Sequence, residues 1–403
     1  MSKLLLGRRI LLGVSSSIAI YKAPEIVRLL QKQGALVRVV MSEESRRFLS
    51  PLVFEALTKA TVLHRDSESW AEGNDHISLS QWAELYLIAP ASANTINKAA
   101  TGIADNLLLT SFLAFGGMKM IAPAMNTKML ANPLTQESLE KLEALGVEII
   151  RSVSKELACG DVGEGALQEP GEIVERVIRA LHRSEFWQGR SVAVSGGGSI
   201  ESIDSVRFIS NRSSGKMSHA LARALYYLGA DVTFIAPEAL HQLPMGIRTI
   251  PVHSARSYQL ALSSWQDSHT NEARAPFIYM VAAISDYESE AFKEGKLKKE
   301  QLGEVWSLTL RKTPDILRSL NKEGFKVIGF KLENAGEEAM KNAKNALYDK
   351  EIDAICLNLI GEHNPMGSDE NELFFITREG AERFLHKSKR ALAFDVIRAS
   401  ERL

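Results

Sequence analysis

The sequence predicts an α/β protein made of two Rossmann-like, three-layer domains. At 192–194 a short apolar strand leads into three glycines, a polar loop, a helix at about 216–228 and a new strand from 232. The same order of strand, small-residue turn, helix, Gly-Ala and strand opens the chain at 9–41. The length of 403 residues also exceeds one ordinary domain. Each half therefore begins its own wound sheet.

The turn at 195–198 is the first candidate for a binding site. The helix after it carries one apolar face at helical spacing, made by Met217, Ala220, Leu221, Ala224, Leu225 and Leu228. Gly229 ends that helix as a left-handed cap. A glycine turn between a strand and a helix lets bare backbone N–H groups approach a phosphate. Its glycines do not follow the dinucleotide-binding spacing, so a turn that only reverses the chain tightly remains an alternative.

In the first half, three small-residue turns follow strands. The strand at 9–13 runs into 14–17, the strand at 85–89 into Pro-Ala-Ser-Ala-Asn at 90–94, and the strand at 120–122 into Pro-Ala-Met-Asn at 123–126. Ligands gather where parallel strands end, so we expect these turns to line one crevice. Pro24 is compatible with the first helix only in its first turn.

The remaining elements alternate along the chain. We expect a domain boundary at 183–190, where the pattern lapses, and a variable polar region near 238–274. In the first half we expect a helix at 136–145, a strand at 147–150, a glycine-rich loop at 158–165 and a helix at 173–181. In the second half we expect strands at 277–283, 327–330, 354–357 and 373–376, helices from 312 and at 335–350, and a helical tail from 380.

Composition excludes several classes of protein. Apolar residues make up 45% and charged residues 24%, as in soluble globular proteins. The formal net charge of −1 gives no overall field that favours nucleic acid or an anionic membrane. No apolar run reaches the roughly 18–20 residues of a membrane span, and the N-terminus does not resemble a signal peptide. Two cysteines cannot form a disulfide framework, which indicates a reducing cytoplasm.

Four residues of the first half are candidates for chemistry. Cys159 lies among glycines, where a thiol is exposed and movable, whereas Cys356 lies in an apolar strand and is structural. His76 precedes an expected strand and is a candidate base or donor near neutral pH, with a surface histidine as the alternative. Asn94 and Asn126 offer donor and acceptor groups at strand ends, or simply cap the next helix.

In the second half, four lysines at 293–299 follow a strand that ends near Asp286. Lysines beside an acid are suited to a triphosphate and its Mg²⁺, although such a run is also typical of a solvated loop. The P-loop pattern, HExxH and paired CxxC motifs are all missing from the sequence, so nothing suggests zinc.

Taken together, these segments resemble a known enzyme family. The matching pieces include GVSSSIAIYKA, PASAN, GIADNLLLT, APAMNTKM and ACGDVGEGAL in the first half, and SGGGSIESIDSVRFISNRSSGKM, AAISDY, KLKK, KTPDIL and DAICLN in the second. They are similar to the bacterial bifunctional phosphopantothenoylcysteine decarboxylase/phosphopantothenate–cysteine ligases of coenzyme A synthesis. The resemblance implies a flavodoxin-like, FMN-dependent decarboxylase domain at 1–188 and a CTP-dependent ligase domain with a parallel sheet at 189–403.

For the ligase half, the resemblance implies activation of 4'-phosphopantothenate by CTP and Mg²⁺ as an acyl-cytidylate, which the amine of L-cysteine then attacks. Asn211 acts on the acyl-cytidylate, Lys296 is catalytic and Asp286 holds the metal. The CTP contacts that the resemblance implies are Ala282, Asp286, Lys296, Lys312, Thr313, Pro314, Asp315, Phe330, Lys344 and Lys350. The family carries a lysine where this chain has Ala346, and a two-residue shift lets Lys344 substitute for it.

For the decarboxylase half, the resemblance implies oxidation of the cysteine thiol, loss of CO₂ and reduction to 4'-phosphopantetheine. His76 assists the first half-reaction, Asn126 binds the substrate carboxylate and Cys159 donates the proton. The FMN contacts implied are Ser15, Ser16, Ser17, Ser42, Ala91, Ser92 and Asn94. The family usually has glycines at two of these positions, and the hydroxyls of Ser16 and Ser17 could bind the flavin phosphate instead.

Partners and competing functions complete the expectations. The resemblance implies a homo-oligomer in which decarboxylase trimers are linked by ligase dimers into a dodecamer, without nucleic acid or membrane. One alternative is an FMN decarboxylase of another cysteine-containing substrate with a degenerate ligase half. Another is a non-catalytic nucleotide-binding regulator or scaffold.

Overall fold

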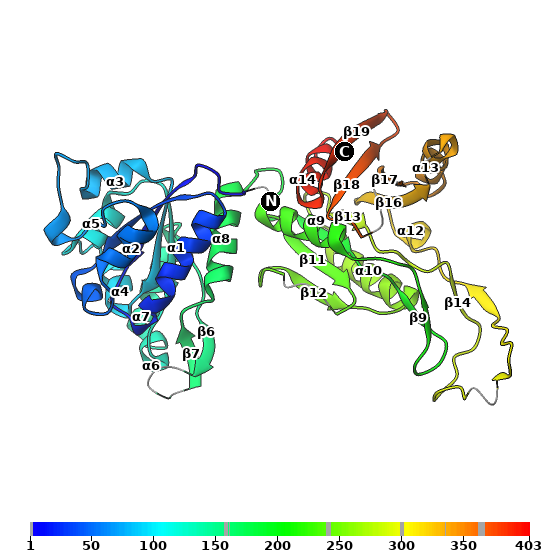
Figure 1. Ribbon diagram of the computed structural model, residues 1–403, viewed down its shortest axis with the longest axis horizontal. Helices are drawn as coiled ribbons and strands as arrows, with labels where there is room; N and C mark the ends of the chain where they lie inside the picture. The colour runs from blue at the N-terminus through cyan, green and yellow to red at the C-terminus, as the bar shows by residue number, and fades with distance from the viewer. Residues whose placement is uncertain are drawn as a thin grey trace. The chain divides into compact units, whose positions relative to one another are not determined.

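The computed structural model describes residues 3–156, 160, 162–238, 243–298, 302–334, 336–361 and 367–403 (Figure 1). The chain divides into two compact units between Leu181 and His182. Residues 182–188, which the resemblance assigns to the decarboxylase domain, lie in the second unit. The reason is Trp187, which is fully buried, packs edge-on against Phe277 and donates its indole N–H to Glu401.

The first unit is built on a five-stranded parallel sheet in the order β2-β1-β3-β4-β5. Its strands are β1 (Arg9–Val14), β2 (Leu36–Met41), β3 (Leu85–Ala91), β4 (Met118–Pro123) and β5 (Glu148–Ile149). Its helices are α1 (Ala23–Lys32), α2 (Pro51–Thr58), α3 (His76–Trp82), α4 (Ala93–Thr101), α5 (Leu107–Ala114), α6 (Thr127–Leu130), α7 (Pro133–Ala144) and α8 (Pro170–His182). This is the flavodoxin-like order, in which the direction of winding reverses between β1 and β3.

Burial explains why these segments form central strands. Every residue of β3 is buried, and β1 is buried after its first residue, so both strands are apolar runs covered on both faces. Pro24 lies in the first turn of α1, as expected. A separate antiparallel hairpin, β6 (Val153–Glu156) with β7 (Val162–Ala166), follows β5.

The second unit is built on an eight-stranded sheet in the order β12-β11-β8-β13-β16-β17-β18-β19. Its strands are β8 (Ser191–Ser195), β11 (Asp231–Ala236), β12 (Arg248–Pro251), β13 (Phe277–Met280), β16 (Lys326–Asn334), β17 (Ala354–Ile360), β18 (Glu370–Ile376) and β19 (Ala381–Ser388). The first six in spatial order are parallel and follow the Rossmann order 3-2-1-4-5-6, while β18 and β19 are antiparallel. The winding reverses between β8 and β13.

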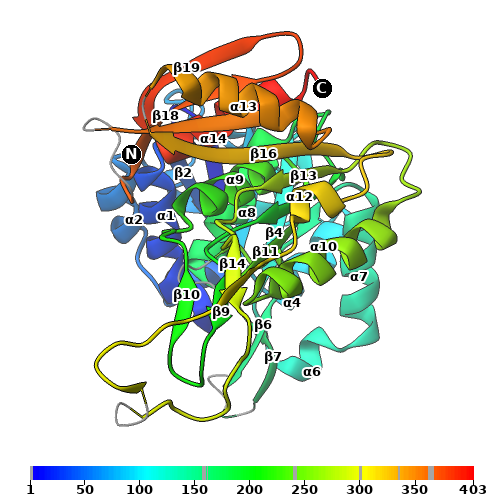
Figure 2. The ribbon, with the colours of Figure 1, turned by 90° about the vertical axis from the view of Figure 1, so that its right-hand side faces the viewer.

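Helices and two small hairpin ladders complete this unit (Figure 2). The helices are α9 (Lys216–Tyr227), α10 (Ala255–His269), α12 (Ile316–Ser319), α13 (Glu337–Asp349) and α14 (Lys389–Ser400). The ladders pair β9 (Ile200–Ser202) with β10 (Phe208–Ser210), and β14 (Tyr287–Ser289) with β15 (Leu310–Lys312). Gly229 has φ of +99°, as the predicted left-handed cap requires.

Four secondary-structure predictions are wrong. The tail from 380 begins with β19, an edge strand whose only buried residue is Phe384. The polar region at 238–274 contains β12 and α10, and α10 buries Tyr258, Leu262 and Trp265. Part of the glycine-rich loop forms β7, because it pairs with β6. His76 begins a helix instead of preceding a strand, because Asp75 caps α3 through the N–H groups of Ile77 and Ser78.

Candidate functional sites

The first candidate site lies at the carboxyl ends of β1 and β3. Ser15 is fully buried, and its hydroxyl donates to the carbonyl of Pro90 at 2.9 Å while accepting the N–H of Ser92 at 2.8 Å. The hydroxyl of Ser17 donates to the carbonyl of Ala124 at 3.2 Å. The structure thus brings the three predicted turns together, because the carboxyl ends of parallel strands lie at one edge of the sheet.

The side chains at these turns divide into occupied and available groups. The hydroxyl of Ser92 caps α4 by accepting the N–H of Thr95, and Ala91 is buried at the end of β3. Ser16 is half-buried and Asn94 is exposed in the first turn of α4. The hydroxyl of Ser42 is buried without a hydrogen-bond partner among the described residues. A buried hydroxyl without a partner is suited to a polar group of a flavin nucleotide.

His76 has a partner that the sequence did not reveal. Its Nδ1 lies 3.2 Å from Oε1 of Glu68, and Trp70 packs edge-on against the imidazole with ring centroids 5.4 Å apart. A carboxylate on one ring nitrogen fixes the orientation of an imidazole and favours a proton there. Burial works against the charge on Asp75, but hydrogen bonds from Ser78 and Ile77 outweigh it and lower the pKa of this helix-capping carboxyl.

Asn126 caps a helix, as the structural alternative predicted. Its Oδ1 accepts the N–H of Lys128 at 2.9 Å. The hairpin lies directly on this turn, because the N–H of Met125 donates to the carbonyl of Gly165 at 3.0 Å. Gly165 has φ of +142°, and a Cβ there would lie 2.3 Å from the carbonyl oxygen of Met125. Cys159 belongs to the segment that joins β6 to β7 and lies outside the described residues.

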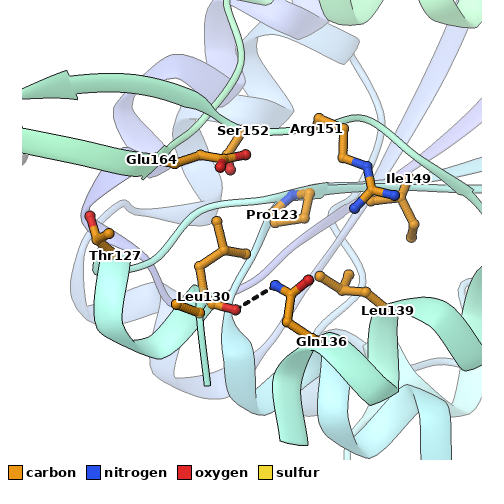
Figure 3. Close-up of a pocket in the computed structure, with 10 residues that line it drawn as sticks. Pro123, Thr127, Leu130, Gln136, Leu139, Ile149, Arg151, Ser152 and Glu164 are labelled. Carbon is orange, nitrogen blue, oxygen red and sulfur yellow. Dashed lines mark hydrogen bonds between the residues drawn. The ribbon is translucent and has the colours of Figure 1, made fainter. Parts of the chain in front are cut away.

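A cavity of about 430 Å³ lies beside the same turn (Figure 3). Its floor is apolar, with Leu130, Leu139 and Ile149, and Arg151 and Glu164 stand at its edge. Arg151 is already paired with Glu143 at 2.8 Å. The cavity contains none of the predicted FMN contacts, so it adjoins the first candidate site without being part of it.

The second candidate site lies at the carboxyl ends of β8 and β13. The buried hydroxyl of Ser195 accepts the N–H groups of Val281 and Ala282 at 3.1 and 3.2 Å. The three glycines that follow leave no room for side chains. A Cβ on Gly196 would lie 2.3 Å from Oγ of Ser218, and one on Gly198 would lie 2.8 Å from the carbonyl oxygen of Asn211. The glycine turn is therefore required by close packing.

Asn211 and several predicted CTP contacts meet at this turn. The side-chain amide of Asn211 donates to the carbonyl of Ile284 at 2.8 Å. The N–H of Thr313 donates to the carbonyl of Asp286 at 3.0 Å, and its hydroxyl donates to that of Ser285 at 2.6 Å. Because Ala282 is bound to Ser195, the structure brings Asn211, Ala282, Asp286 and Thr313 into one place. The carboxylate of Asp286 is exposed there.

The other predicted CTP contacts lie on several different elements of the second unit. Asp315 caps α12 and forms an ion pair with Lys350 at 3.2 Å, with Pro314 beside it in the chain. Phe330 is half-buried in β16, and Lys312 is exposed at the end of β15. On α13, Ala346 packs towards the core, whereas Lys344 is exposed and lies about 120° around the helix from Lys350. Lys344 and Lys350 do not share a face.

Lys296 lies on an exposed loop that hangs from the β9–β10 hairpin. One contact that holds this loop is made by the buried carboxylate of Asp204, which accepts the N–H of Leu297 at 3.2 Å. Sequence reasoning missed Asp204 and Glu68. An aspartate between two short strands is a turn signal, but its long-range partner is not visible in the sequence.

Among the described residues, no helix is both long and apolar enough to span a membrane. No group of three or more His, Cys, Asp or Glu side chains in these parts of the chain is arranged to bind a metal ion.

Comparison with known proteins assigns both halves. The family described as "Flavoprotein" matches residues 2–182, and the "DNA/pantothenate metabolism flavoprotein C-terminal domain" family matches residues 187–402. The "Coenzyme A biosynthesis bifunctional protein CoaBC" of Vibrio parahaemolyticus is 35% identical over 399 residues, covering 98% of each chain. The chain belongs to this bifunctional family.

Two other relatives are informative. A "Cysteine/Cysteine sulfinic acid decarboxylase" from an unknown prokaryotic organism is 38% identical, covering 87% of this chain and 98% of that one. A solved structure of a mutant PPC decarboxylase, "complexed with pantothenoylaminoethenethiol", is 37% identical, with a TM-score of 0.39, covering 42% of this chain and 96% of that structure. Within the bifunctional family, the first unit is the flavoprotein half and the second is the ligase half.

Proposed function

We propose that this chain makes 4'-phosphopantetheine from 4'-phosphopantothenate, L-cysteine and CTP, by a ligation at the second site and a decarboxylation at the first. The observation that carries the proposal is the pair of switch points. In each unit, turns that carry some of the predicted site residues meet where the order of the sheet reverses, the place where open α/β sheets bind ligands.

For the ligation, the groups around the glycine turn have distinct roles. A carboxylate oxygen of phosphopantothenate attacks the α-phosphorus of CTP, and pyrophosphate leaves. The amine of cysteine then attacks the acyl carbon, and CMP leaves. Backbone N–H groups of the turn at 196–198 and Lys296 are suited to the phosphates, and Asn211 to the acyl-cytidylate. The exposed carboxylate of Asp286 fits Mg²⁺, which is often held by one or two carboxylates together with substrate phosphates.

For the decarboxylation, Ser16, Ser17, Ser42 and the Pro90–Asn94 turn would hold FMN. When bound there, FMN would supply two-electron redox chemistry for oxidising the substrate thiol and for the final reduction. His76, oriented by Glu68, takes the proton released when the thiol is oxidised. Asn126, whose side-chain oxygen caps α6, would bind the substrate carboxylate. Cys159 supplies the proton that completes the aminoethanethiol product.

The setting of the enzyme is also part of the proposal. We infer a cytoplasmic homo-oligomer in which first units associate as trimers and second units as dimers, giving a dodecamer. Two cysteines and a net charge near zero are consistent with this setting. Mass measurement of the purified protein in solution tests the assembly, and a monomer would contradict it.

A coupled assay tests the function. Purified protein should be yellow with a flavin spectrum and should convert phosphopantothenate, cysteine and CTP into phosphopantetheine, with one pyrophosphate released per product. An assay without phosphopantothenate distinguishes the proposed function from the main alternative, an FMN decarboxylase of another cysteine-containing substrate. If the protein forms cysteamine from cysteine at an equal rate without CTP, it is a decarboxylase of another substrate and the ligase assignment fails.

Replacement of Cys159 tests the decarboxylase mechanism. Cys159→Ser should release CO₂ from phosphopantothenoylcysteine but accumulate an oxidised, enethiol-type product, because the final proton is missing. Cys356→Ser is the matched control, since Cys356 is fully buried in β17 and burial raises the pKa of its thiol. A normal yield of phosphopantetheine from Cys159→Ser would eliminate the proton-donor role.

A further inference from the structure

Asp204 lies in the turn between β9 and β10 and its carboxylate is buried by the chain around it. Oδ1 accepts the N–H groups of Val206 and Arg207, both at 2.7 Å. Oδ2 accepts the guanidinium of Arg207 at 2.7 Å and the N–H of Leu297 at 3.2 Å. One carboxylate thus joins the hairpin to a segment more than ninety residues further along the chain.

Backbone contacts extend this junction along the lysine loop, residues 293–298. The N–H of Lys293 donates to the carbonyl of Ile203 at 3.1 Å, and the N–H of Gly295 donates to the hydroxyl of Ser205 at 3.0 Å. Arg207 also donates to the carbonyl of Leu297 at 3.2 Å. Figure 2 shows the hairpin and the yellow loop projecting from the same end of the sheet. Lys296 is therefore bracketed by two fixed residues, Gly295 and Leu297.

The same hairpin leads into the second candidate site. Strand β10 ends at Ser210, and the next residue, Asn211, is bound to Ile284 beside the glycine turn. Asp204 is the only carboxylate among the described residues that accepts a hydrogen bond from the lysine loop in this structure. Its contacts connect the Asn211 amide at the sheet to a lysine that would otherwise sit on a long, exposed loop.

We propose that Asp204 is a positioning residue of the ligase, which latches the lysine loop to the β9–β10 hairpin and so places Lys296 relative to Asn211. This inference rests on the proposed ligase function and adds a residue to it. Asp204 acts through Lys296 and does not itself touch the nucleotide. The latch fixes the backbone on both sides of Lys296, which limits the positions that its ammonium group can take relative to the phosphates of CTP.

The latch depends on the negative charge of the Asp204 carboxylate. Burial works against the charge on Asp204, but the N–H groups of Arg207, Val206 and Leu297 and the Arg207 guanidinium lower its pKa to about 2. A carboxyl with a depressed pKa contributes stability above its unfolded pKa of about 4 and loses it as the pH falls towards 2. The latch therefore remains formed throughout the physiological range.

Kinetics of paired variants provide the first test. Asp204→Asn keeps the shape of the side chain but turns an N–H₂ group towards donors. It should lower CTP-dependent pyrophosphate release about tenfold or more, the effect of losing a hydrogen bond to a charged group. Added to Lys296→Ala, it should cause no further loss. Multiplied losses in the double variant would overturn the proposal, because independent sites add in free energy.

Two control variants distinguish a latch from a general structural role. Asp353→Asn removes a carboxylate that accepts the N–H of Val327 at 2.8 Å. This contact lies at the amino end of β16, opposite the second candidate site. The loss of pyrophosphate release that it causes should therefore multiply with the loss caused by Lys296→Ala. Ser205→Ala removes only the hydroxyl that binds Gly295 and should cause a smaller loss than Asp204→Asn. Decarboxylation of phosphopantothenoylcysteine should be unchanged in all of them, which reports that the chain is folded.

Limited digestion with trypsin tests the latch without any ligase activity. Asp204→Asn should be cleaved after Lys293, Lys296 or Lys298 about tenfold faster than the unmodified protein, while Asp353→Asn should be cleaved there at the unmodified rate. Equal cleavage in Asp204→Asn would overturn the latch. Faster cleavage in a protein that consumes no CTP would retain the latch and reject the proposed ligase function.

Discussion

The two switch points share one device and differ in what surrounds it. In each unit a buried serine at the end of the first strand, Ser15 or Ser195, accepts backbone N–H groups from the turn after the neighbouring strand. Around Ser15 the polar side chains already cap helices or bind carbonyl groups. Around Ser195 the backbone is bare glycine, and the polar side chains come from a hairpin and a loop outside the main sheet.

This difference matches what each site has to hold. A permanently bound cofactor suits a preformed binding site in which few polar side chains lack a hydrogen-bond partner. Reactants that enter and leave at every turnover are served by exposed backbone donors and by side chains carried on a projecting loop. The comparison predicts that the first site depends on the sheet and its turns, and the second on the fit between the glycine turn and the hairpin.

The largest effect should come from Gly198→Ala. Its Cβ would lie 2.8 Å from the carbonyl oxygen of Asn211, which is backbone and cannot rotate away. Displacement of Asn211 by a fraction of an ångström or more should reduce CTP-dependent pyrophosphate release about a hundredfold. Decarboxylation of added phosphopantothenoylcysteine should be unchanged. Normal ligation by this variant would show that Asn211 is not held by the turn.

Gly165→Ala is the corresponding change in the first unit. The added Cβ would lie 2.3 Å from the carbonyl oxygen of Met125, so the hairpin has to move off the Asn126 turn. We expect a roughly tenfold to hundredfold loss of decarboxylation, with FMN still bound and ligation intact. Release of FMN in parallel with the loss of activity would mean that the hairpin holds the cofactor instead of the substrate.

Ser15→Ala and Ser195→Ala should distinguish an effect on cofactor binding from an effect on the free energy of unfolding alone. Each substitution leaves backbone groups unpaired in a buried place and should lower the free energy of unfolding by about 1–3 kcal/mol. Ser15→Ala should also release FMN at a lower denaturant concentration, followed by flavin fluorescence. Ser195→Ala should lower the denaturant concentration at which the second unit unfolds and leave the denaturant concentration of FMN release unchanged. Identical flavin release in both variants would contradict two separate sites.

The smallest effect should come from Ser42→Ala. The hydroxyl of Ser42 is buried without a partner among the described residues, so its removal should change the free energy of unfolding by less than about 0.5 kcal/mol. If this hydroxyl binds FMN, its removal should weaken FMN about fivefold to tenfold in a titration of the apoprotein. Unchanged FMN affinity would remove Ser42 from the cofactor site.

The sequence predicted the central strands and the meeting of the turns for a physical reason. Apolar runs such as 85–89 and 192–194 are buried on both faces, and parallel strands place their carboxyl ends at one edge. It did not reveal β19, which is mostly exposed and exists through its pairing with β18. Glu68 and Asp204 were also missed, because their roles depend on contacts with His76 and Leu297 that local patterns do not encode.

The proposed function requires two complete sites in one chain. The most direct test mixes two inactive preparations, Gly198→Ala and Cys159→Ser, with phosphopantothenate, cysteine and CTP. The first variant should ligate about a hundredfold more slowly and the second lacks the final protonation, so neither alone should form phosphopantetheine at more than about a hundredth of the normal rate. Their mixture should form it much faster than either component alone, although Cys159→Ser diverts part of the phosphopantothenoylcysteine into the oxidised product. A mixture as inactive as its components would contradict the assignment of one reaction to each site.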